Sequence, residues 1–303
     1  MTASPGALAV PAPPRWHGVA FALTGAVAFS GKAIIAKLAY RHGVDAVTLV
    51  MYRMLFALPM FLALAWWAGR GQRRLERRDW LAVAGLGFCG YYLASMLDFM
   101  GLQYISASVE RLVLYLNPTL VLLLGLAFLG QKVRPRQWVS MALSYLGVLL
   151  VFGHEVTLAG RDAVLGMALV FGSALSYAIY LLMSGEEIKR IGAMRLTGLA
   201  TSAACGFCLL HFVALRPLSA AVVAEPVLWL SLLNAVACTF APVLLVMLAI
   251  ERLGAGITAQ TGMVGPLSTI LMGVVILGEP FTPWVAAGTA CVLAGVWLLA
   301  RWR

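Results

Sequence analysis

Leu116-Asn117-Pro118 reappears 148 residues later as Val264-Gly265-Pro266, and Leu129-Gly130-Gln131 reappears at the same offset as Leu277-Gly278-Glu279. A single shift aligns both pairs of motifs, so the sequence predicts an internal repeat. Each copy is long enough to hold several helices. The repeat therefore decides the overall organisation of the chain.

Composition places this repeat in a membrane. Hydrophobic residues make up 62% of the chain, charged residues 11%, and the mean hydropathy is +0.92. Apolar stretches close to the ~20 residues that cross ~30 Å of hydrocarbon recur along the chain. The predicted spans are 18–40, 46–68, 80–102, 107–130 and 136–153 in the first copy, and 163–184, 194–215, 227–250, 256–277 and 282–300 in the second.

The predicted fold is an all-α integral membrane protein with ten transmembrane helices. A unit with an odd number of spans, used twice, lies once each way up in the bilayer. We therefore expect two inverted five-helix repeats, over residues 17–154 and 162–303, after a disordered cytoplasmic tail over residues 1–16. Many secondary transporters have this architecture.

Basic residues predict the orientation. Fifteen Lys and Arg residues flank the spans on the side that holds both termini, and four lie on the other side. Basic loops stay in the cytoplasm, so both termini are predicted to be cytoplasmic. The net charge of +10 is then explained by topology signals and by contacts with anionic lipid, rather than by nucleic-acid binding.

Away from the ends of the predicted spans, five charged residues lie inside them: Lys32, Arg53, Asp98, Glu110 and Arg111. Such residues cost ~2.5–3.5 kcal/mol each at the centre of a helix on insertion scales, so they are rarely accidental. One interpretation is a gate, or a site for the polar groups of a substrate. The other is that the pairs Lys32–Asp98 and Arg53–Glu110 are buried ion pairs that orient helices.

The second copy does not repeat these charges. The positions 148 residues later are Tyr180, Thr201, Val246, Thr258 and Ala259. Because the copies are inverted, one end of a pathway is predicted to be charged and the other polar and aromatic.

Helical spacing suggests which side chains line a cavity, because a polar stripe on an apolar span must face protein or water. The candidate cavity residues are Tyr91, Ser95 and Asp98 on the third span, Tyr177 and Tyr180 on the sixth, and Gln260 and Thr261 on the ninth. Aromatic rings can stack on an apolar solute while hydroxyl and amide groups hold its polar end. Packing in the core or in the interfacial belt is the alternative for each tyrosine.

Pro118 and Pro266 lie near the middle of equivalent predicted spans. Proline removes a backbone donor and displaces the carbonyl four residues earlier. Paired interruptions in two repeats indicate a binding site at the repeat interface, whereas simple packing kinks are the alternative.

These motifs carry a family resemblance. They comprise residues 101–110 (GLQYISASVE), Leu116-Asn117-Pro118 and Leu129-Gly130-Gln131 in the first copy, and residues 250–255 (IERLGA), Gly265-Pro266 and Leu277-Gly278-Glu279-Pro280 in the second. The chain resembles the EamA-type members of the drug/metabolite transporter superfamily, and among them the bacterial aromatic amino-acid exporters. Gln131 departs from the glutamate usual in that family, while Glu279 keeps it. The resemblance implies a multi-pass protein of the bacterial inner (plasma) membrane.

The predicted function is secondary export of small organic metabolites, amino acids including aromatic ones, by alternating access through a central cavity. A carrier of phosphosugars or nucleotide sugars is the alternative within the fold, and a non-transporting membrane assembly protein is the alternative outside it. The expected partners are a small-molecule substrate and the bilayer, not nucleic acid, and the expected state is a monomer. No nucleotide-binding or metalloprotease motif is present, so we expect no enzyme, no cofactor and no metal site.

Overall fold

The computed structural model describes residues 15–130, 132–253, 257–258, 261–262 and 264–301. Every regular element in these residues is helical. The elements of the first half are α1 (Arg15–Tyr40), α2 (Ala46–Gly69), α3 (Arg77–Gly87), η1 (Phe88–Leu93), α4 (Ala94–Gly101), α5 (Ala107–Leu114), α6 (Asn117–Leu129) and α7 (Pro135–Ile191). Those of the second half are α8 (Ala193–Leu215), η2 (Leu218–Ala221), α9 (Glu225–Ala235), η3 (Val236–Phe240), α10 (Ala241–Leu253), α12 (Val264–Met272), η4 (Gly273–Leu277) and α13 (Pro283–Arg301).

Eight helices are long and apolar enough to cross a membrane by length and composition, from Trp16–Tyr40 to Glu225–Ile250. They coincide with the first eight predicted spans. The last two predicted spans correspond to shorter apolar helices, Val264–Leu277 and Pro283–Leu299. The chain is therefore a multi-pass membrane protein.

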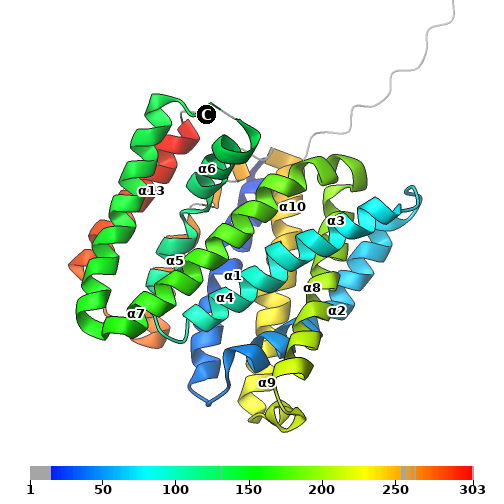
Figure 1. The fold of residues 1–303 in the computed structure, drawn as a ribbon, viewed down its shortest axis with the longest axis horizontal. Coiled ribbons are helices and arrows are strands. Elements are labelled where there is room, and N and C mark those ends of the chain that lie inside the picture. Colours follow the sequence, from blue (N-terminus) through cyan, green and yellow to red (C-terminus); the bar gives the residue numbers. More distant parts are fainter. Residues whose placement is uncertain (1–14, 131, 254–256, 259–260, 263, 302–303) are drawn as a thin grey trace, which may run out of the picture.

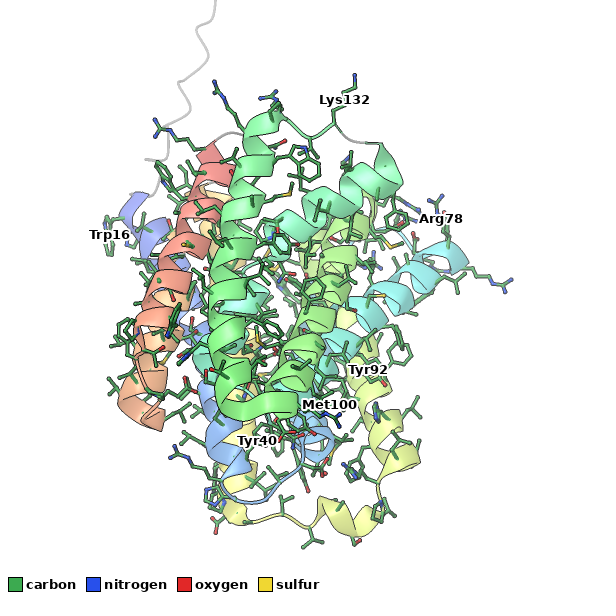
Figure 2. All side chains as sticks on the ribbon, turned by 60° about the vertical axis from the view of Figure 1, so that its left-hand side comes forward. Trp16, Tyr40, Arg78, Tyr92, Met100 and Lys132 are labelled. Carbon is green, nitrogen blue, oxygen red and sulfur yellow. The ribbon has the colours of Figure 1, made fainter. Side chains whose placement is uncertain are left out.

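The helices form one bundle with two distinct ends. The end of α13 and the start of α1 lie at one end, here called the terminal end, and the α1–α2 turn lies at the opposite loop end (Figure 1). Trp16, Arg78 and Lys132 all lie in the terminal-end half, while Tyr40 and Met100 lie toward the loop end (Figure 2).

The long helix α7 is two helices joined at a kink. Gly160 lies inside it with φ 58° and ψ −129°, a backbone conformation that glycine adopts more readily than any other residue. The segment after Gly160 runs from the loop end to the terminal end, opposite to α1 (Figure 1). This segment and α1 occupy equivalent positions in the two copies of the sequence pattern.

Packing follows the 148-residue offset. α1 packs on α9 and α10, and the equivalent segment of α7 packs on α3 and α4. Equivalent positions also make close contacts: a Cβ on Gly147 would lie 2.6 Å from the Gly288 oxygen, and one on Gly295 would lie 2.7 Å from the Ser140 oxygen. Glycine at these positions allows α7 and α13 to touch through their backbones.

Two π-helical turns also obey the offset. η1 begins at Phe88 and η3 begins at Val236, and each interrupts an apolar span. A π-turn frees backbone carbonyls that an α-helix would use, and such turns are frequent at functional sites. In η1 the Ser176 hydroxyl donates to the Cys89 oxygen at 2.8 Å, and in η3 the Thr239 hydroxyl donates to the Asn234 oxygen at 2.9 Å.

Candidate functional site

The five charged residues inside the spans gather in the loop-end half of the bundle. Lys32, Arg53, Asp98, Glu110 and Arg111 are each at most 7% exposed. They come from α1, α2, α4 and α5, and we call them the ionic cluster. Three cations and two carboxylates are thus enclosed within the protein.

The pairing within the ionic cluster centres on Lys32. Its Nζ lies 2.5 Å from Asp98 Oδ2 and 3.7 Å from Glu110 Oε1. Glu110 Oε2 also lies 3.8 Å from Arg111 Nε. The expected Lys32–Asp98 ion pair is present. The expectation of an Arg53–Glu110 ion pair is wrong, because Glu110 lies beside Lys32 and Arg111 instead.

Several polar atoms of the ionic cluster have no hydrogen-bond partner among the described residues. They are Asp98 Oδ1, both carboxylate oxygens of Glu110, and Nε and one terminal nitrogen of Arg111. Buried polar atoms in native proteins are normally hydrogen-bonded, and unpaired ones call for an explanation. This cluster thus keeps hydrogen-bonding capacity that the protein itself does not use.

Arg53 differs from the other two cations. Its Nε donates to the Thr239 hydroxyl at 2.9 Å, and a terminal nitrogen donates to the Ser95 hydroxyl at 3.5 Å. Within the described part of the chain, no carboxylate lies within ion-pair distance of Arg53. A buried guanidinium with only neutral partners can bind a planar anion by donating two parallel hydrogen bonds to it.

Two phenylalanine rings lie between the cations. Phe99 lies 5.0 Å from the Arg53 guanidinium carbon and 5.9 Å from Lys32 Nζ. Phe29 lies 5.5 Å from Lys32 Nζ and 5.6 Å from the Arg111 guanidinium carbon. The ring faces attract the cations and so reduce the electrostatic cost of holding three of them close together.

The tyrosines predicted on the third and sixth spans form a second cluster. The hydroxyls of Tyr91 and Tyr180 lie 3.2 Å apart, and the rings of Tyr177 and Tyr180 stack at 5.4 Å. A Cβ on Gly90 would lie 2.4 Å from the Tyr180 ring, so glycine is needed for this approach. Tyr91 is seven residues before Asp98, about 10 Å along a helix, so this tyrosine cluster lies nearer the terminal end.

The two clusters occupy equivalent positions of the repeat. Tyr180 corresponds to Lys32, and Tyr91 corresponds to Thr239, the partner of Arg53. Lys32 and Arg53 thus meet the η3 region from α1 and α2, as their equivalents meet η1 from α7 and α8. Pseudosymmetric positions therefore carry charge toward the loop end and hydroxyls with aromatic rings toward the terminal end.

The two helix interruptions meet near the centre of the bundle. α5 ends at Leu114 and α6 begins at Asn117, with Pro118 in its first turn. The Tyr115 hydroxyl, in the first interruption, donates to the Gly262 oxygen at 3.1 Å, next to the start of α12, which contains Pro266. The Thr261 hydroxyl donates to the Ile257 oxygen at 2.9 Å. Gln260, predicted to line the cavity, lies outside the described residues.

Glu279 links the second repeat to the start of α5 at the loop end. Its carboxylate accepts hydrogen bonds from the Ala107 nitrogen at 2.7 Å, the Ser108 nitrogen at 3.2 Å and the Ser108 hydroxyl at 2.8 Å. Arg41 donates to the Leu277 oxygen at 2.9 Å nearby. A carboxylate at the start of α5 satisfies unpaired amides and complements the helix dipole, so the second repeat is tied to the first there.

Sequence reasoning missed several partners in these clusters. Thr239 accepts the hydrogen bond from the Arg53 side chain, and the Asn234 amide donates to the backbone oxygen of Lys32 at 3.1 Å. The 148-residue offset could have pointed to Thr239, because it is the position equivalent to the predicted cavity residue Tyr91. Glu279 was noticed as a motif residue, but a capping role across repeats requires the three-dimensional arrangement.

Comparison with known proteins agrees with this architecture. The model of the EamA-like transporter family matches residues 16–153 and 164–301. The chain is 31% identical over 275 residues to "Uncharacterized transporter YcbK" of Bacillus subtilis, covering 86% of each chain. It is 32% identical over 152 residues to "Chloramphenicol-sensitive protein RarD" of Pseudomonas aeruginosa, covering 45% of this chain and 48% of the relative. A solved crystal structure superposes with a TM-score of 0.63 at 17% identity, covering 95% of this chain and 99% of that one, a likeness of fold alone.

Proposed function

The chain belongs to the EamA-like transporter family, and from this premise we propose that it exports small organic metabolites across the bacterial inner membrane, with amino acids, including aromatic ones, as substrates. Family and relatives identify a membrane transporter rather than an enzyme. The proposal concerns the substrate, the direction of transport and the location.

The observation that carries the substrate proposal is that one buried cluster holds both Arg53 and carboxylate oxygens that accept no hydrogen bond. Arg53 has only neutral partners, while Asp98 Oδ1 and both Glu110 oxygens lack hydrogen bonds. An amino acid carries a carboxylate and an ammonium group. Its carboxylate would pair with Arg53 and its ammonium with Asp98 or Glu110, which satisfies both sets of groups at once.

We place the proposed substrate cavity between the ionic cluster and the tyrosine cluster. The proposed walls are Tyr91, Ser95, Asp98, Tyr177, Tyr180, Gln260 and Thr261. Lys32, Arg53, Glu110 and Arg111 form the proposed gate at the loop end, and the interruptions at Pro118 and Pro266 mark the repeat interface. Alternating access would expose this cavity first at the terminal end, which we propose to be cytoplasmic, and then at the loop end.

A carrier of anionic metabolites is the second candidate. Three cations face only two carboxylates in the ionic cluster, so it holds an excess positive charge that a phosphosugar could neutralise. An amino acid remains the first proposal because it also gives Asp98 and Glu110 a partner.

Counterflow in proteoliposomes tests this function. Vesicles are loaded with unlabelled phenylalanine, threonine, a phosphosugar or nothing, and uptake of labelled phenylalanine is followed with and without a proton gradient. We expect interior amino acid alone to drive uptake, because facilitated exchange requires no coupling ion. Absence of uptake under every amino-acid loading removes amino acids as substrates.

Arg53→Gln tests the anion contact, with Arg161→Gln on the exposed loop-end surface as its control. We expect Arg53→Gln to raise the half-saturating phenylalanine concentration at least about tenfold, because it removes a charge-assisted contact. Arg53→Lys keeps the charge but lacks the planar guanidinium, so its half-saturating phenylalanine concentration should lie between those of the wild type and Arg53→Gln. Unchanged counterflow in Arg53→Gln would show that the carboxylate binds elsewhere.

A further inference from the structure

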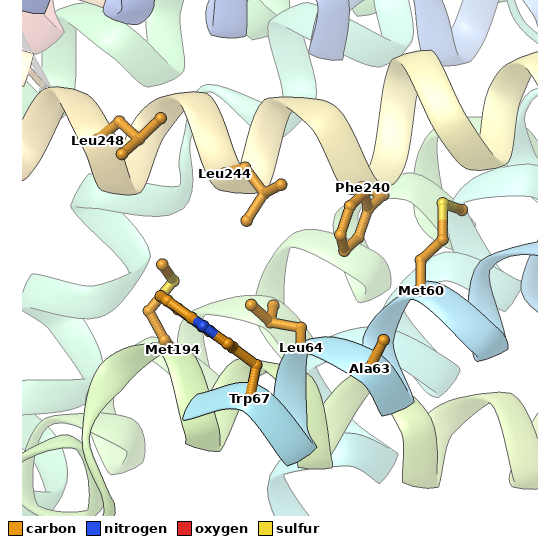
Figure 3. A pocket seen from close by; sticks show the side chains of 8 residues that line it. All are labelled: Met60, Ala63, Leu64, Trp67, Met194, Phe240, Leu244 and Leu248. Carbon is orange, nitrogen blue, oxygen red and sulfur yellow. The ribbon is translucent and has the colours of Figure 1, made fainter. Parts of the chain in front are cut away.

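An apolar groove of about 530 Å³ opens between α2 and α10 in the terminal-end half of the bundle. Met60, Leu64 and Trp67 of α2 form one wall, Phe240, Leu244 and Leu248 form the other, and Met194 of α8 lies at one end (Figure 3). Ala63 is exposed on the same side of α2. The volume of the groove falls in the range of small-molecule binding sites.

The groove is aligned with Arg53. Met60 and Leu64 follow Arg53 by seven and eleven residues, which places all three on one face of α2. On the opposite wall, Phe240 directly follows Thr239, the residue that accepts the hydrogen bond from Arg53. Both walls therefore belong to helical segments that carry Arg53 or its partner Thr239 farther toward the loop end, and Phe240 is adjacent in the chain to that partner.

The repeat provides an internal control. The positions equivalent to Met60, Leu64 and Leu244 are Cys208, Phe212 and Met96, and all three are buried, at 0%, 4% and 3% exposure. The equivalent of Phe240 is Tyr92, whose hydroxyl lies 2.6 Å from His211 Nδ1. Leu64 is itself buried, at 6% exposure, so the two sites differ at Met60 and Leu244, which are partly exposed, and at Phe240, whose equivalent is hydrogen-bonded. The pseudosymmetric helix packing alone therefore does not require these positions to be open.

We propose that this groove is an apolar subsite of the transport pathway, which receives the apolar side chain of an amino acid before its carboxylate reaches Arg53. The inference rests on the proposed function and adds a preference for large apolar side chains. Charge complementarity selects the occupant, since the helical segments that form the groove hold, farther toward the loop end, a buried cation with no acidic partner among the described residues.

A second apolar groove, of about 560 Å³, supplies the matched control. It lies between α12 and α13 and is lined by residues such as Leu271, Ala290 and Leu293. Neither groove has a charged lining residue, but the residues of the second groove come from helical segments that do not carry Arg53 or Thr239. Ala63 and Ala290 are both exposed alanines on a groove wall, so tryptophan at either position adds the same bulk in a similar apolar setting.

The experiment measures counterflow of labelled alanine and labelled phenylalanine in the wild type, Ala63→Trp and Ala290→Trp. We expect the wild type to have the lower half-saturating concentration for phenylalanine. Ala63→Trp should raise that value for phenylalanine about tenfold and leave alanine unchanged, because only the larger side chain needs the groove. Ala290→Trp should leave both values unchanged.

Three results would overturn the inference. If Ala63→Trp leaves the phenylalanine-to-alanine ratio unchanged, the groove does not receive the substrate. If it weakens both amino acids equally, the added ring acts on a general conformational step. If the wild type transports neither amino acid, the proposed function fails first, which separates that failure from one confined to the groove.

Discussion

Asp98→Asn should strongly destabilise the protein. Asp98 and Lys32 side chains are 2% and 8% exposed, and their charged atoms lie 2.5 Å apart. At an effective dielectric constant of ~20, that separation corresponds to an attraction of roughly 7 kcal/mol, and the Lys32–Glu110 separation of 3.7 Å to roughly 4 kcal/mol. The variant loses the first attraction but no longer carries the free-energy cost of burying a charged carboxylate, and the attraction between Lys32 and Glu110 remains. We therefore expect a loss of about 3 kcal/mol, the lower end for a broken buried pair.

A double-mutant cycle isolates the pair. Lys32→Met combined with Asp98→Asn removes both charges and leaves Glu110 beside Arg111, so most of the stability should return. Thermal unfolding in detergent should show Asp98→Asn about 10 °C below the wild type. Glu186→Gln, at an exposed pair with Lys189, is the control and should change stability by less than about 0.5 kcal/mol. An additive double variant, or an Asp98→Asn protein as stable as the wild type, would refute the reasoning.

Three further predictions concern the loop end and the glycine contacts. Glu279→Gln should cost about 2 kcal/mol in thermal unfolding, because the start of α5 loses charge-assisted hydrogen bonds, whereas exposed Glu225→Gln should have little effect. Gly147→Ala should cost about 1–3 kcal/mol, because its Cβ would meet the Gly288 oxygen, while Gly206→Ala, with open space, should not destabilise, and equal melting temperatures would contradict the close helix contact. Burial alone would raise the pKa of Asp45, but hydrogen bonds from Thr48 and the charge of Arg216 lower that pKa overall. The ionised Asp45 carboxylate therefore contributes fully to the stability of the fold above its unfolded-state pKa of about 4, and this contribution is lost as pH falls through its folded-state pKa. Asp45→Asn should accordingly make the melting temperature fall less steeply on the acid side of its pH profile.

Hydropathy predicts the spans well because burial in lipid constrains every residue of a helix in the same direction. The ends of α1, α2 and α8 lie within a few residues of the predicted bounds. Charge inside a span was equally visible, and the structure gathers all five predicted residues in one cluster. The cost of an isolated charge in hydrocarbon makes such gathering expected.

Pairing within the cluster could not be predicted, because it depends on how each helix is rotated about its axis. Glu110 could have faced Arg53 or Lys32 with the same hydropathy. The π-turns change that rotation without any compositional signature, and Thr239 reaches Arg53 from one of them. The groove depends on side-chain packing, which also fills its equivalent at the loop end.

The π-turn η1 has a consequence for chain length. Asp98 lies beyond Phe88–Leu93, and each residue of a helix advances the direction of the side chains by about 100°. A π-turn closes its hydrogen bonds from residue i to residue i+5 and so holds one residue more than the α-turn it replaces. Removing one residue from η1 would let it close as an ordinary α-helix while α4 keeps its direction, whereas removing one residue of α4 ahead of Asp98 would turn the Asp98 carboxylate away from Lys32 by about 100°. The π-turn is therefore the part of this span that can absorb a single-residue deletion, and the Lys32–Asp98 pair fixes the number of residues that follow it.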